Sequence, residues 1–178
     1  MRSNLDTAKL DAFVQAIGRM ATGPGRVYLV GGATALLLGI RDQTIDIDIK
    51  LDPEPKGIFE SISILKERLE INVELSSPDQ FIPPFPGWRE RSELITKAGE
   101  VEFFHYDFYG QVMSKITRGH RHDLTDASEI IRLGKVDVGK LSLLFEEIQP
   151  NLVRYPAINP AVLRERFEAF ISELGAIG

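Results

Sequence analysis

Apolar and polar positions along the chain follow two periods, and the period indicates which element each segment forms. Apolar residues that recur at helical spacing predict helices, and strict alternation predicts strands with one face in a core. From Thr44 to Leu51 every second residue is apolar, so we expect a half-buried strand there. Similar patterns predict further strands at 26–30, 71–75, 93–97 and 101–106, and helices at 4–21, 33–39, 58–69, 107–116, 125–133, 138–149 and 160–174.

The order of these segments indicates an α/β fold at the front of the chain and helices at its end. We expect one domain over residues 1–178, with an α/β core at 1–106 and a helical C-terminal part at 107–178, because no flexible linker divides them. Asp107 and Thr125 are expected to cap the helices that follow them. Between the two parts, the aromatic residues Phe81, Phe85 and Trp88 are expected to anchor a proline-rich loop.

Composition excludes several classes of function. The chain has no cysteine, which excludes disulfides, thiolate zinc sites and cysteine nucleophiles. Its net charge of −5 argues against a surface that coats nucleic acid generally. The sequence has neither the apolar run of a membrane span nor a secretory signal, so we expect a cytoplasmic protein with no membrane partner. Dinucleotide-binding and P-loop motifs are also absent from the sequence.

Two carboxylates of the alternating strand carry the chemistry. Asp46 and Asp48 lie two positions apart, so their side chains project from the same face. Neighbouring carboxylates repel each other unless a cation lies between them, and Mg²⁺ prefers such oxygen ligands. A third acid on a neighbouring strand would allow two metals; Glu74 is the first candidate and Glu102 the reserve. The alternative for this pair is a solvated strand face.

A glycine pair precedes the aspartates. Gly31 and Gly32 follow an apolar strand and open a short helix, where backbone N–H groups can approach a phosphate. Gly32 precedes Asp46 by 14 positions, which leaves room for a short helix and a returning strand. Arg41 lies between the two motifs and is a candidate phosphate ligand.

The segment LVGGATALLLGIRDQTIDIDIKL, residues 29–51, resembles the signature of the nucleotidyltransferase superfamily. Its form is most similar to bacterial and archaeal nucleotidyltransferase-like proteins, including abortive-infection-type toxin–antitoxin members. The resemblance implies a mixed β-sheet flanked by helices, with Glu74 in the position of the third acid. Arg41 and Thr44 belong to the same pattern and are implied to lie at the nucleotide.

A later segment, SKITRGHRHDLTD at residues 114–126, looks like the basic segment that this superfamily carries on a later helix. On that resemblance Lys115 contacts nucleotide phosphate, and Asp123 and Asp126 brace the basic residues or the helix. The alternative for this basic cluster is a solvated loop beside the end of a helix.

These observations favour a nucleotidyltransferase that depends on Mg²⁺ or Mn²⁺ and moves a nucleoside monophosphate from an NTP to RNA, a protein hydroxyl or a small molecule. Asp46, Asp48 and Glu74 would hold metal and carry catalysis. Gly31, Gly32, Arg41, Thr44 and Lys115 would hold the nucleotide. The alternative is a non-catalytic member of a toxin–antitoxin or regulatory pair that uses the same fold to bind a partner protein. A metal-dependent nuclease is a weaker alternative, because a nuclease binds no triphosphate and would leave the glycine turn without a role.

Overall fold

The computed structural model describes residues 4–177, and the chain divides into two compact units. The first, here called the sheet unit, comprises Met1–Ser77 and Ser92–Tyr106. The second, here called the helical unit, comprises Pro78–Arg91 and Asp107–Gly178. Within the described residues, no helix has both the length and the apolar character needed to cross a membrane.

A five-stranded mixed sheet organises the sheet unit, in the order β3-β2-β1-β5-β4. Strand β1 pairs antiparallel with β2 and parallel with β5, while β2 and β3 are parallel and β4 and β5 form an antiparallel hairpin. This arrangement confirms the predicted mixed α/β fold. The strands are β1 (Gly25–Val30), β2 (Asp46–Leu51), β3 (Asn72–Leu75), β4 (Glu93–Ala98) and β5 (Val101–His105).

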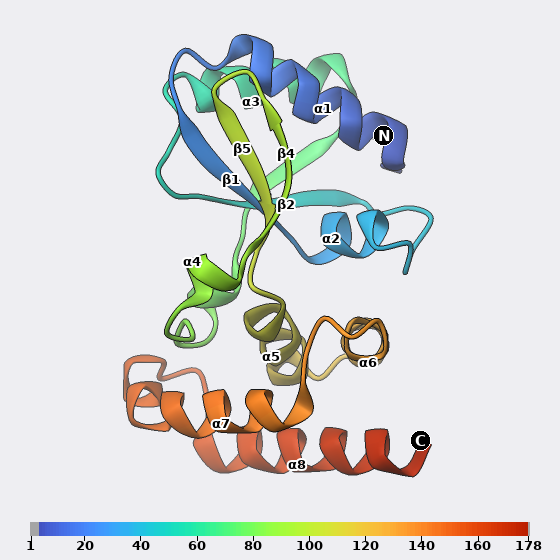
Figure 1. The fold of residues 1–178 in the computed structure, drawn as a ribbon, viewed down its shortest axis with the longest axis vertical. Helices are drawn as coiled ribbons and strands as arrows, with labels where there is room; N and C mark the ends of the chain where they lie inside the picture. The colour runs from blue at the N-terminus through green and yellow to red at the C-terminus, as the bar shows by residue number, and fades with distance from the viewer. Residues whose placement is uncertain (1–3, 178) are drawn as a thin grey trace. The chain divides into compact units, whose positions relative to one another are not determined.

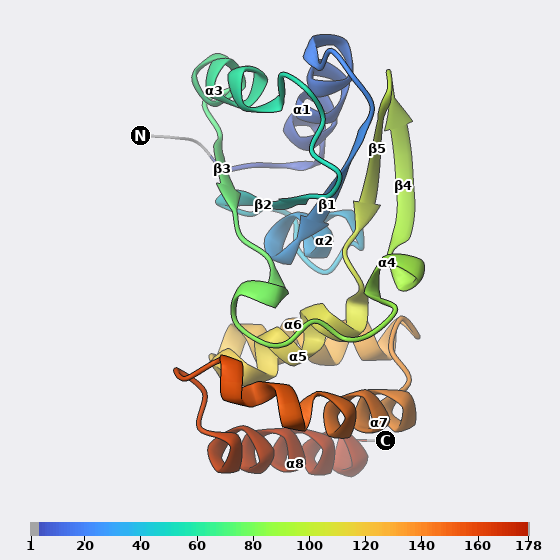
Figure 2. The ribbon, with the colours of Figure 1, turned by 90° about the vertical axis from the view of Figure 1, so that its left-hand side faces the viewer.

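Two helices, α1 (Thr7–Met20) and α3 (Ile58–Arg68), pack side by side against this sheet (Figures 1 and 2). The alternation in β2 decides which of its side chains they cover: Ile47 and Ile49 are fully buried in the core shared with both helices. Because side chains alternate along a strand, the acids of β2 lie on the opposite face. A shorter helix, α2 (Gly31–Leu37), follows β1 directly.

The helical unit consists of short and long helices around a second set of buried side chains. Its longest helices pack pairwise, α5 against α6 and α8, and the rings of Phe145 and Phe167 stack at 4.3 Å between α7 and α8. Asp107 caps α5 by accepting the backbone N–H of Tyr109, which confirms the predicted cap. The helices are α4 (Trp88–Arg91), α5 (Phe108–Arg118), α6 (Arg121–Arg132), α7 (Val138–Ile148) and α8 (Pro160–Ile177), with 3-10 turns at Pro78–Gln80 and Gln149–Arg154.

Two local predictions were wrong. Helix α6 begins at Arg121 after His120, not at a cap formed by Thr125. The Thr125 hydroxyl instead donates to the Arg121 carbonyl one turn earlier, a bond that threonine makes inside helices. In the proline-rich loop Phe85 and Trp88 are buried as predicted, but Phe81 is 44% exposed and is not buried with them.

Candidate functional site

The register between β2 and β3 gathers the predicted acids. Asp46 lies opposite Asn72, and Asp48 lies opposite Glu74, in this parallel pair. Paired residues of neighbouring strands point to the same face of a sheet. The three acids and Asn72 therefore form a block of four polar side chains on the face opposite the buried isoleucines of β2.

Asn72 links two of these acids. Its Nδ2 donates to Asp46 Oδ1 at 2.7 Å and to Glu74 Oε1 at 2.9 Å. The opposite amide orientation would direct the carbonyl oxygen at two carboxylates, so these contacts determine which atom is the nitrogen. Sequence reasoning placed Asn72 on the polar face of its strand but gave it no role; its strand position beside Glu74 was the available signal.

The glycine turn lies against the same strand. Val30, the last residue of β1, pairs with Asp48. Gly31 follows at φ +60°, a conformation that favours glycine, and a Cβ at this position would lie 3.1 Å from Asp48 Oδ2. At Gly32 a Cβ would lie 2.0 Å from Thr44 Oγ1. The turn thus brings its backbone close to Asp48 and Thr44, and no side chain fits at Gly32 without a shift.

A buried hydrogen-bond chain holds the helix that carries this turn. Thr34 on α2 is fully buried, and its hydroxyl donates to the Leu29 carbonyl at 3.1 Å. The same hydroxyl oxygen, Thr34 Oγ1, lies 3.2 Å from His105 Nδ1. Since the threonine proton is committed to Leu29, the histidine Nδ1 is the donor in this contact. Sequence reasoning missed both side chains; Thr34 is the one polar residue within an otherwise small and aliphatic helix.

The two candidates for the third acid differ in position. Glu74 is on β3, directly beside β2, whereas Glu102 is on β5, and β1 separates β5 from β2. Glu102 also accepts a hydrogen bond from Arg26 Nε at 3.1 Å. Arg41 is half-buried in the segment between α2 and β2. The geometry therefore favours Glu74 over Glu102 as the acid nearest the Asp46–Asp48 pair.

These donors fit one kind of cation site. Among the residues that the structure describes, no three His, Asp or Glu side chains converge as a group that could hold a metal. Asp46 and Asp48 are half-buried on one face, and Mg²⁺ commonly takes one or two carboxylates and completes its shell with substrate phosphates and water. The residues present therefore fit a cation that is shared with a nucleotide, and they do not form a complete protein cage.

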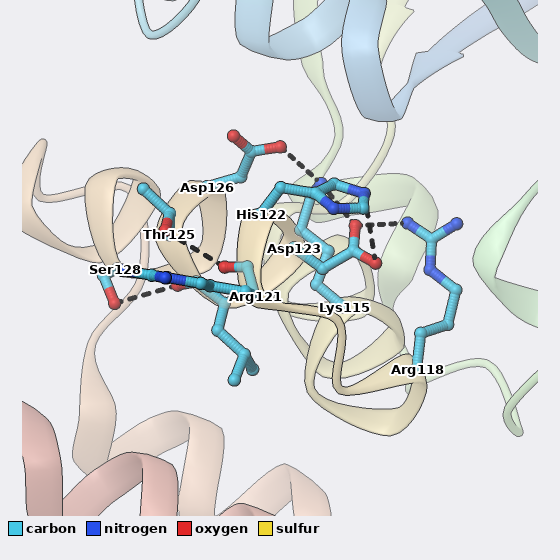
Figure 3. Close-up of polar contacts among 9 residues, drawn as sticks. Lys115, Arg118, Arg121, His122, Asp123, Thr125, Asp126 and Ser128 are labelled. Carbon is cyan, nitrogen blue, oxygen red and sulfur yellow. Dashed lines mark hydrogen bonds and ion pairs between the residues drawn. The ribbon is translucent and has the colours of Figure 1, made fainter.

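The predicted phosphate ligand Lys115 belongs to the helical unit, where it is held by acids of α6 (Figure 3). It is 4% exposed, and its Nζ lies 2.8 Å from Asp126 Oδ2 and 3.4 Å from Asp123 Oδ1. Arg118 donates to the same Asp123 oxygen at 2.7 Å. Asp123 and Asp126 thus brace the basic residues of this segment, as the resemblance implied.

The other oxygen of Asp123 has a different environment. Oδ2 is buried and, within the described part of the chain, accepts no hydrogen bond. His122 Nε2 lies 3.9 Å from this oxygen, on a side chain that is 68% exposed. The carboxylate is therefore stabilised from one side, by Lys115 and Arg118.

Comparison with known proteins bears on this site. Residues 8–171 match the family model described as "Nucleotidyltransferase of unknown function (DUF6036)". No curated protein and no solved structure matched the chain. The family match spans most of the chain and includes the glycine turn, the acids of β2 and β3, and the Lys115 segment. The chain therefore belongs to this family of nucleotidyltransferases of unknown function.

Proposed function

We propose that the protein transfers a nucleoside monophosphate from an NTP to an acceptor hydroxyl, with Mg²⁺ or Mn²⁺ as the cofactor. The observation that carries this proposal is the register of β2 and β3, which aligns Asp46 and Asp48 with Asn72 and Glu74 beside the glycine turn. Family membership supports the reaction class. We also propose that both units act as one domain, since the family match runs across both, and that the protein acts in the cytoplasm.

Each acid has a proposed part in this reaction. Asp46 and Asp48 would hold the divalent cation, which when bound neutralises phosphate charge and polarises the α-phosphate. Glu74 would accept the proton of the acceptor hydroxyl. The acceptor oxygen then attacks the α-phosphorus, the bond from that phosphorus to the bridging oxygen breaks, and pyrophosphate leaves. Positioning and charge neutralisation would supply most of the acceleration.

The remaining residues would hold the nucleotide. The backbone at Gly31 and Gly32 comes close to Asp48 and Thr44, which supports a triphosphate placed against this turn. Arg41 and Thr44 would contact phosphate oxygens there. Lys115 is also proposed as a cationic phosphate ligand. Since its ammonium already contacts Asp126, a phosphate would have to share that ammonium with the carboxylate.

A second candidate function is a non-catalytic binding module, the partner-binding member of a toxin–antitoxin or regulatory pair. The observation that favours it is the ion cluster around Lys115, in which the lysine is buried and committed to two aspartates. In such a module these contacts would be purely structural, and the fold would present a surface to a partner protein.

One experiment separates the two. The protein is incubated with each α-labelled NTP, Mg²⁺ or Mn²⁺, and total cell RNA, protein and small metabolites. We expect label to move to one acceptor fraction, and Asp46→Asn and Asp48→Asn to abolish the transfer. Glu102→Gln is the matched control. Glu102 is an acid of the same sheet, but its strand β5 lies two strands away from β2.

The binding arm of the experiment decides a negative result. Calorimetry with Mn²⁺ and each NTP at millimolar concentration tests the site without an acceptor. If neither the wild type nor Asp46→Asn binds Mn²⁺ and an NTP, the transferase is contradicted and the binding module remains. A toxic effect of expression that Asp48→Ala removes would support the active enzyme, whereas co-purification of a partner chain without any transfer would support the module.

A further inference from the structure

Asn72 connects two acids of the polar block on β2 and β3. It is the first residue of β3 and lies opposite Asp46 in the register, two positions before Glu74. Its amide nitrogen has two hydrogens, and the two contacts, at 2.7 and 2.9 Å, use one for each acid. The amide therefore ties an acid of β2 to an acid of β3 across the strand boundary.

These bonds oppose the repulsion between the two carboxylates. Asp46 Oδ1 and Glu74 Oε1 are both within hydrogen-bond distance of one nitrogen, so they lie close together. Like charges this close repel each other. An amide that donates to both offsets part of this repulsion and restricts the rotamers of both side chains. Groups that donate to metal-ligating carboxylates commonly orient them for the metal in this manner.

We propose that Asn72 is a positioning residue that holds Asp46 and Glu74 in the arrangement required for the divalent cation and the nucleotide. This inference rests on the proposed function, because the two acids are there assigned to the metal and to the proton of the acceptor. Asn72 does not itself contact the reacting atoms. It sets the spacing and orientation of two groups that do.

A purely structural role for Asn72 makes a different prediction. In that case its removal lowers the thermal stability of the protein and leaves metal affinity unchanged. The positioning role predicts the opposite: metal affinity falls, and stability changes little because the side chain lies at a half-exposed position at the start of a short strand. The two roles are therefore separated by measuring both quantities on the same variants.

The test uses the full chain and Mn²⁺ as the probe, with electron paramagnetic resonance of free Mn²⁺ in the presence and absence of non-hydrolysable NTP analogues. For Asn72→Ala we expect Mn²⁺ affinity to fall about 10- to 100-fold, with little change in melting temperature. The matched control is Asn4→Ala, which removes an asparagine that donates to the neutral Gln43 side chain at 2.8 Å. Its Mn²⁺ affinity should equal that of the wild type.

Asn72→Asp gives a second, independent measurement. It replaces the donor with a third carboxylate between two others, so the metal-free protein should melt at a lower temperature than the wild type. Mn²⁺ should then raise its melting temperature by more than it raises that of the wild type, because the cation relieves the added repulsion and binds only the folded state. An equal or smaller rise contradicts the proposed position of the amide beside the cation.

The outcomes separate this inference from the function on which it rests. If Asp46→Asn abolishes Mn²⁺ binding while Asn72→Ala binds like the wild type, the positioning role is wrong and the proposed metal site stands. If the wild type binds no Mn²⁺ with any NTP analogue, both proposals are wrong. If Asn72→Ala loses stability with unchanged affinity, Asn72 is only structural.

Discussion

Replacing Lys115 with methionine removes a buried ammonium and retains most of the volume of the side chain. Lys115 is 4% exposed and joins α5 to α6 through Asp126 at 2.8 Å and Asp123 at 3.4 Å. Asp123 also pairs with Arg118 at 2.7 Å, a contact that the substitution leaves in place, whereas Asp126 loses its ammonium partner. Removing one partner of a buried ion pair costs about 3–5 kcal/mol. Because Arg118 remains, we expect about 3 kcal/mol for Lys115→Met.

Urea unfolding followed by tryptophan fluorescence measures this cost. Trp88 is the single tryptophan of the chain and is a buried residue of the helical unit, so its emission reports on the unit that contains Lys115. A loss of about 3 kcal/mol corresponds to a fall in melting temperature of about 6–12 °C for a chain of this size. The exposed Lys140 of α7, in the same unit, supplies the control. Lys140→Met should change the free energy of unfolding by at most about 1 kcal/mol, the scale of the exposed cation–π contact that it removes.

A double variant tests the assignment to the pair. Replacing both partners of a buried ion pair with apolar residues is often neutral or stabilising, so Lys115→Met with Asp126→Leu should be more stable than Lys115→Met alone. A cost below about 1 kcal/mol for Lys115→Met, or strict additivity of the two single changes, would refute the reasoning. Loss of NTP binding with an unchanged free energy of unfolding would instead assign Lys115 to the nucleotide.

Three further predictions follow from other parts of the fold. Gly32→Ala should cost about 1–3 kcal/mol in urea unfolding, because its Cβ would lie 2.0 Å from Thr44 Oγ1. Thr34→Val should cost about 1–3 kcal/mol, since it removes the hydroxyl that donates to the Leu29 carbonyl and that lies 3.2 Å from the buried His105 Nδ1. Glu146→Gln should cost at most about 1 kcal/mol at pH 7, because this exposed carboxylate forms a bidentate pair with an arginine of α8.

The Glu146 effect depends on pH with a definite sign. The hydrogen bond from Arg164 lowers the pKa of the Glu146 carboxyl below its ordinary value of 4.5. A lowered pKa means that the pair contributes stability above pH 4.5 and that this contribution is lost as the pH falls through the folded-state value. The difference between wild type and Glu146→Gln should therefore vanish in acid; a difference that grows below pH 4.5 contradicts the assignment.

Controls make the other two variants interpretable. Gly175→Ala places a methyl group in open space within α8, so it should be neutral or slightly stabilising, in contrast to Gly32→Ala. Thr96→Val is the control for Thr34→Val, since Thr96 is a half-buried threonine of β4. Equal costs for Thr34→Val and Thr96→Val would show that the buried chain to His105 does not stabilise α2.

The sequence by itself determined the features that depend on local periodicity. Strict alternation in β2 put Asp46 and Asp48 on one face and Ile47 and Ile49 in the core, because successive side chains of a strand point in opposite directions. The sequence also predicted the helix cap at Asp107, since a short acidic side chain before a helix accepts hydrogen bonds from its first N–H groups.

The tertiary structure decided which distant residues meet. The pairing of β2 with β3 makes Glu74, and not Glu102, the neighbour of Asp48. It also places Asn72 between Asp46 and Glu74. Strand order and register arise from packing between segments far apart in the chain, and no local period contains them. Lys115 is a similar case. The sequence shows that it is basic, but only the packing of α5 against α6 decides that its ammonium is buried between two aspartates.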